Sequence, residues 1–87
     1  MAGASAPVEA IVVTSPACHL CEDALDVLGD AAPAVVVRTI GIRSDEGRAL
    51  AERYQPALTP LVLLDGEPFS VGRLPRGKLR RLLAGRV

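Results

Sequence analysis

The chain has 87 residues, of which 49% are apolar, and its formal net charge is zero. This length is enough for one compact domain and excludes a second core or a large substrate pocket. The composition excludes the disordered and collagen-like classes. We expect a flexible tail over residues 1–7 and one domain over residues 8–87.

The first residues do not have the pattern of a secretory signal. Residues 1–10 contain no Lys or Arg, and the apolar run Ile11 to Val13 is far shorter than the apolar part of a signal peptide. No segment approaches the roughly 18 apolar residues of a membrane helix. We therefore expect a cytoplasmic protein that does not associate with a membrane.

The first half of the chain predicts a strand, a helix and a second strand. Val8 to Thr14 is apolar and rich in β-branched residues, which is typical of a buried strand. From Cys18 to about Asp30 the apolar residues recur at helical spacing, and Pro33 ends this helix. Residues 34–40 again have the composition of a strand.

A second helix and a hairpin follow. Residues 44–46 have the sequence of a helix cap and first turn, and the helix reaches Tyr54, although Gly47 lowers its propensity. Residues 61–64 and 67–71 flank Asp65-Gly66, which favours a hairpin with a type I′ turn. Pro68 within the second hairpin strand predicts an edge position, because proline lacks the N–H that a central strand needs.

The last element is a basic helix. Pro75 is expected at its first position and Gly85 at its end, with Leu79, Leu82 and Leu83 on one face. The order is strand, helix, strand, helix, strand, strand, helix. Strands joined by a helix are expected to be parallel and the hairpin antiparallel. The predicted fold class is therefore α/β, with a mixed four-stranded sheet flanked by helices.

Both cysteines belong to one Cys-x-x-Cys unit, Cys18-His19-Leu20-Cys21, at the junction of the first strand and first helix. The N–H groups and positive dipole end of a helix stabilise a thiolate, so Cys18 is the expected nucleophile. Cys21 lies one turn deeper and is expected to resolve a mixed disulfide. His19 is either an ordinary exposed residue or a group that tunes the thiolate through its charge.

Taken together, these features resemble the glutaredoxin-like members of the thioredoxin superfamily over about residues 8–84. The resemblance is carried by a strand, then Ser15-Pro16-Ala17-Cys18-His19-Leu20-Cys21, then Leu58-Thr59-Pro60 before a hairpin, and it is nearest to a Cys-His-Leu-Cys subgroup. It implies a thioredoxin fold of the order βαβαββα and a thiol-disulfide oxidoreductase. It also implies a cis Pro60 facing the cysteines, with the backbone of Thr59 pairing with the substrate.

Three features depart from glutathione-using glutaredoxins, which usually have Cys-Pro-Tyr-Cys where this chain has Cys-His-Leu-Cys. Those proteins have a Lys three residues before the first Cys, where this chain has Ser15. They also have Gly-Gly followed by acidic residues where residues 71–75 read Val-Gly-Arg-Leu-Pro. The resemblance therefore does not supply the usual glutathione site, although Arg73 or Arg76 offers a substitute contact for a carboxylate.

The expected partners follow from the same chemistry. They are a protein or small-molecule disulfide as substrate, and glutathione, another low-molecular-weight thiol or a flavin-dependent reductase as electron donor. No bound organic cofactor is expected, since there is no Gly-rich phosphate motif. With only Tyr54 and Phe69 as aromatic residues, nucleic acid is not an expected partner.

Two alternatives remain open at this point. Cys-x-x-Cys at a strand-to-helix junction also holds Cu(I) or Zn²⁺ in small metal-binding modules, but these usually have Met where this chain has Pro16. Two cysteines and His19 cannot supply the four ligands of a closed zinc site, so no metal ligands are assigned within one chain. A metal or cluster bridging two chains remains the open form of this alternative. The second alternative is a non-catalytic interaction domain. Its docking element would be the segment Arg73 to Val87, which contains six basic residues and no acidic one.

Overall fold

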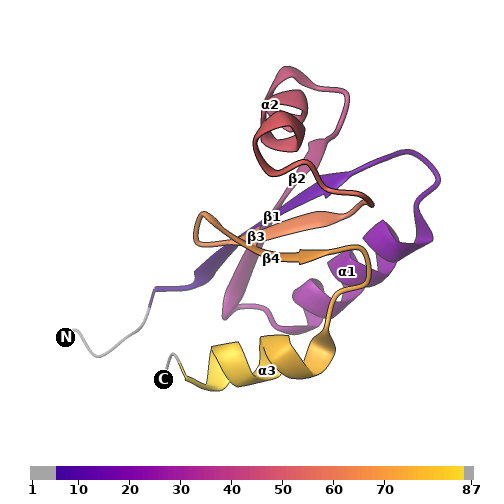
Figure 1. Cartoon of the computed structure of the whole chain (residues 1–87). Helices are drawn as coiled ribbons and strands as arrows, with labels where there is room; N and C mark the ends of the chain where they lie inside the picture. Colours follow the sequence, from indigo (N-terminus) through magenta and orange to yellow (C-terminus); the bar gives the residue numbers. More distant parts are fainter. Residues whose placement is uncertain (1–5, 86–87) are drawn as a thin grey trace.

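The computed structural model describes residues 6–85 and has the predicted order of elements (Figure 1). The elements are β1 (Val8–Thr14), α1 (His19–Asp30), β2 (Val35–Gly41), α2 (Asp45–Tyr54), β3 (Leu61–Leu64), β4 (Glu67–Val71) and α3 (Arg76–Ala84). Residues 1–5 of the expected tail and residues 86–87 of the expected domain lie outside the described residues. Within residues 6–85, no helix has the length and apolarity needed to cross a membrane.

The four strands form one mixed sheet in the order β2-β1-β3-β4. β1 and β2 are parallel, as expected for strands joined by a helix, whereas β3 is antiparallel to β1 and β4 is antiparallel to β3. β4 is an edge strand, which confirms the position predicted from Pro68. Asp65 and Gly66 both have positive φ, of 51° and 83°, as the predicted type I′ turn requires.

The expectation that all helix-joined strands are parallel is wrong for β2 and β3. β2 ends at Gly41 beside Thr14, and β3 begins at Leu61 beside Val13, so both lie at the same end of the sheet. α2 lies near this end of the sheet and does not carry the chain back to the end where β2 begins (Figure 1). The chain therefore enters β3 in the direction opposite to β2. The mixed sheet follows from this change of direction.

Helices cover both faces of the sheet. α1 and α3 lie on one face and α2 on the other (Figure 1). The larger core is enclosed by α1, α3 and the sheet and consists of Val8, Ala10, Val12, Ala24, Leu28, Val35, Val62, Leu64, Leu74 and Leu79. On the α2 side a smaller cluster forms around Val13, Leu61 and Leu63, against which Ile11, Ile42, Leu50 and Tyr54 pack. Both faces of the C-terminal end of β1 are therefore buried, and the loop after it starts from a fixed position.

The helix ends agree with the sequence in most respects. Ser44 caps α2, since its Oγ accepts a hydrogen bond from the N–H of Gly47 at 3.0 Å. α1 ends at Asp30, before Pro33, as predicted. Pro75 is the cap of α3 and not its first helical residue, because its ψ of 103° is extended and the helix begins at Arg76.

Candidate active site

The loop between β1 and α1 presents the two cysteines. It spans residues 15–18, and Ala17 has a φ of 53°, a left-handed conformation that residues with a Cβ seldom adopt. Cys18 lies at the cap position of α1, one residue before the helix begins, with extended backbone angles. The sequence pattern predicts Cys18 inside the first turn, and the structure moves it by one residue. The turn at Ala17 therefore directs the chain into α1 with Cys18 at the positive end of the helix.

Cys18 and Cys21 form a disulfide, with their Cα atoms 5.2 Å apart. The N–H of Cys21 donates a hydrogen bond to the sulfur of Cys18 at 3.1 Å, so that Cys18 acts as the capping group of α1. Cys18 is half-buried, while Cys21 is only 3% exposed. A molecule from solvent therefore reaches the sulfur of Cys18 more readily than that of Cys21.

Thr59 lies against Cys18, and the next residue is Pro60. The sulfur of Cys18 is 3.5 Å from Oγ1 of Thr59 and 3.8 Å from its carbonyl oxygen. The Thr59–Pro60 peptide bond is cis, and Pro60 is buried. The N–H of Gly72 donates to the carbonyl of Pro60 at 2.9 Å, which fixes this loop to the end of β4.

Ser15 is a residue of the site whose contact the sequence does not predict. Its Oγ is 2.7 Å from Oγ1 of Thr59, across a separation of 44 positions in the chain. The sequence singles out Ser15 only as the position where glutathione-using glutaredoxins have Lys. Its contact is not foreseeable, because the pairing depends on how the loops at the ends of β1 and α2 meet.

Three titratable residues, His19, Glu22 and Asp23, lie next to the cysteines in the chain. His19 is exposed and makes no hydrogen bond or ion pair within residues 6–85, and its tuning role stays a prediction. Glu22 is exposed in the first turn of α1, and Asp23 forms an ion pair with Arg76 of α3 at 2.8 Å. Arg76 therefore offsets an acidic charge two residues beyond Cys21.

Two exposed apolar side chains lie next to Thr59 and Gly72 in the chain. Leu58, directly before Thr59, is 59% exposed, and Val71, directly before Gly72, is 45% exposed. A Cβ built on Gly72 would lie 3.2 Å from Cδ1 of Leu58, so the two loops touch here. Leu58 therefore adds exposed apolar surface directly before Thr59, the residue that contacts Cys18.

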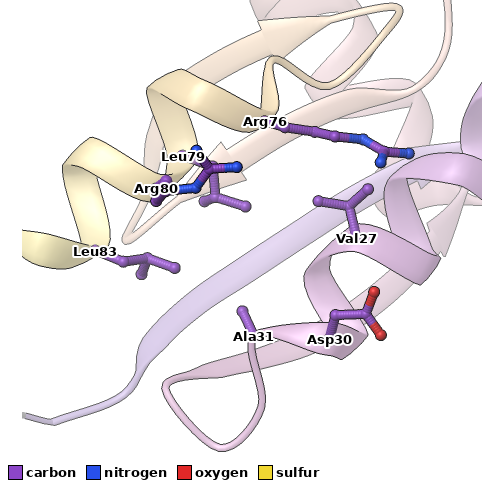
Figure 2. Close-up of a pocket in the computed structure, with 7 residues that line it drawn as sticks. All are labelled: Val27, Asp30, Ala31, Arg76, Leu79, Arg80 and Leu83. Atoms are coloured by element: carbon purple, nitrogen blue, oxygen red, sulfur yellow. The ribbon is translucent and has the colours of Figure 1, made fainter.

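A separate cavity of about 280 Å³ lies between α1 and α3 (Figure 2). Its lining is Val27, Asp30, Ala31, Arg76, Leu79, Arg80 and Leu83. Neither cysteine lines it, and neither does Thr59, so the reactive sulfurs lie outside this cavity. Elsewhere, no three His, Cys, Asp or Glu side chains of residues 6–85 gather in an arrangement that fits a metal ion.

The comparisons with known proteins agree with this geometry. The family model described as "Glutaredoxin-like domain" matches residues 9–84. Among solved structures, a mutant thioredoxin from Halobacterium salinarum NRC-1 is similar in fold, with a TM-score of 0.61 and 22% sequence identity over 91% of this chain and 74% of that chain. The comparison with curated proteins finds no match. The structural similarity shows a thioredoxin fold, and the family match over residues 9–84 shows that the chain belongs to the glutaredoxin-like domain family.

Proposed function

We propose that the protein is a thiol-disulfide oxidoreductase that works through the Cys18–Cys21 dithiol. The observation that carries this proposal is the position of the Cys18 sulfur, which caps α1, accepts the N–H of Cys21 and is bonded to the Cys21 sulfur. A helix N-terminus stabilises a thiolate at this position. The difference in exposure between the two cysteine residues supports Cys18 as the nucleophile and Cys21 as the resolving residue.

The reaction begins with the reduced dithiol. The Cys18 thiolate attacks one sulfur of a substrate disulfide, a bond forms between them, and the other substrate sulfur leaves as a thiolate that takes a proton from solvent. The Cys21 thiol then loses its proton and attacks Cys18. The Cys18–Cys21 disulfide forms, and the second substrate thiolate is released. The substrate disulfide bond is broken, and the substrate gains the two electrons that the protein dithiol loses. Its two thiolates take up two protons, one released by Cys21 and one that Cys18 gave to solvent when its thiolate formed.

The Thr59–Pro60 loop supports substrate binding in this proposal. The carbonyl of Thr59 lies 3.8 Å from the attacking sulfur, so it can pair with the backbone of a substrate bonded to Cys18. Leu58 and Val71 would then contact apolar side chains of the substrate. Glutathione or another low-molecular-weight thiol resets the dithiol in two exchange steps, or a reductase does so. Arg73, exposed after β4, is a candidate contact for the carboxylate of such a thiol.

Two cysteine variants test the proposal. With a peptide disulfide as substrate and excess thiol as reductant, Cys18→Ser is expected to abolish reduction, because the remaining thiol, Cys21, is buried. Cys21→Ser keeps the nucleophile but cannot resolve, and it is expected to accumulate a mixed disulfide with the peptide on Cys18, detectable by mass. Full activity of Cys18→Ser, or a mixed disulfide on Cys21 in the wild-type protein, would contradict the assignment.

A further inference from the structure

A line of contacts runs from the end of β1 to the reactive sulfur. Oγ of Ser15 lies 2.7 Å from Oγ1 of Thr59, and that Oγ1 lies 3.5 Å from the sulfur of Cys18. All three side chains are half-buried, so water competes less for these contacts than it does at the surface. Ser15 does not touch the sulfur itself, and its hydroxyl acts only through Thr59.

The protons in this line depend on the redox state of Cys18. In the disulfide form the sulfur has no charge and is a weak acceptor, so the short hydroxyl contact dominates. In the reduced form a thiolate is a charged acceptor and attracts the hydroxyl proton of Thr59. Oγ1 of Thr59 carries a single proton, so the hydrogen bond between the two hydroxyls must then be donated by Ser15.

We propose that Ser15 is a positioning residue which, by donating to Oγ1 of Thr59, directs the Thr59 hydroxyl proton at the Cys18 thiolate. The inference rests on the proposed oxidoreductase function. It gives the Cys18 sulfur a second hydrogen-bond donor, the Thr59 hydroxyl, beside the N–H of Cys21. The pair stabilises the reduced thiolate more than the disulfide, because the hydrogen bond to a charged sulfur is the stronger one. The Ser15–Thr59 pair therefore makes the dithiol a weaker reductant than the helix position alone would make it.

A double-mutant cycle on reduced protein tests this chain of action. The rate of Cys18 alkylation against pH reports its thiolate, and equilibration with thiol/disulfide buffers gives the reduction potential. Thr59→Val keeps the side-chain shape and removes the hydroxyl. At pH values below the midpoint of the alkylation profile, this variant is expected to have about tenfold less Cys18 in the thiolate form. A tenfold change is the scale of one hydrogen bond to a charged group. The potential becomes more negative, by about 30 mV for a tenfold change.

Ser15→Ala is expected to act in the same direction but about threefold, because it weakens the orientation of the Thr59 hydroxyl without removing it. In the Thr59→Val background the same substitution is expected to change neither the alkylation profile nor the potential. Ser15→Thr restores a hydroxyl at this position and should return both quantities to the wild-type values.

Ser70→Ala is the matched control. Ser70 is also half-buried, but its Oγ has no hydrogen-bond partner among the described residues and no contact with Cys18, so neither readout should move. An unchanged Ser15→Ala profile, or an equal effect of Ser15→Ala with and without the Thr59 hydroxyl, would overturn the inference while leaving the oxidoreductase intact. A wild-type protein without a reversible dithiol couple would overturn the proposed function, and the inference with it.

Discussion

Replacing Gly47 with alanine is predicted to destabilise the fold, although alanine is the better helix former. Gly47 is buried in the first turn of α2, where the helix meets the end of β2. A Cβ built there would lie 2.9 Å from Cα of Ile42 and would overlap the carbonyl group of Gly41. These are backbone atoms, so no side chain can turn aside to make room.

The magnitude follows from two opposing terms. Overpacking of this kind costs about 1–3 kcal/mol, and contact with backbone favours the upper value. The gain in helix propensity from Gly to Ala offsets about 1 kcal/mol of that cost. The net loss of about 2 kcal/mol corresponds to a fall of about 8–16 °C in Tm for a domain of this size.

Gly77→Ala provides the matched control, since Gly77 also lies in the first turn of a helix, α3. There the nearest atom to a new Cβ is Nη1 of Arg81 at 3.6 Å, an ordinary contact with the end of a flexible side chain. Gly77→Ala is expected to stabilise the protein by about 0.5–1 kcal/mol. Urea unfolding followed by circular dichroism measures both variants. A Gly47→Ala protein as stable as the wild type, or one stabilised like Gly77→Ala, would refute the steric reasoning.

Two further predictions concern the core and the surface near the site. Leu28 of α1 is fully buried in the larger core, and Leu28→Ala is expected to lower stability by about 2–5 kcal/mol. Leu58→Ala, at an exposed position, should change stability by less than about 0.5 kcal/mol in the same unfolding experiment. Arg76→Met is expected to lower stability by less than about 1 kcal/mol, because the Arg76 side chain is 64% exposed and that of Asp23 31%, so water reaches the ion pair. The difference should shrink as salt rises. A loss for Arg76→Met that is larger than this and independent of salt would show a role other than the ion pair.

The order and kind of the seven elements were predictable because each leaves a local signal in the sequence. Asp65-Gly66 specified the hairpin, and Ser44 specified the start of α2. Gly47 shows the limit of such signals. Locally it argues against a helix, but its missing side chain lets α2 approach the turn after Gly41, a requirement set by a different element.

The direction of β3 and the contact made by Ser15 were not predictable for a related reason. No local pattern within residues 42–60 predicts that the segment containing α2 begins and ends at the same end of the sheet. That arrangement follows from the pairing of Leu61 with Val13. The Ser15–Thr59 hydrogen bond in turn requires that arrangement. By contrast, Cys18 and Cys21 were predictable as a pair, because their spacing and the helix between them are local.

The measurement that tests the central claim most directly is a redox titration of Cys18 and Cys21 in thiol/disulfide buffers. Alkylation and mass measurement give the oxidised fraction at each potential, and metal analysis of the purified protein accompanies them. A reversible two-electron transition between about −300 and −120 mV in metal-free protein is the result expected of a dithiol oxidoreductase. Cysteines that resist oxidation until bound metal is removed, or that fail to oxidise as a pair, would contradict it.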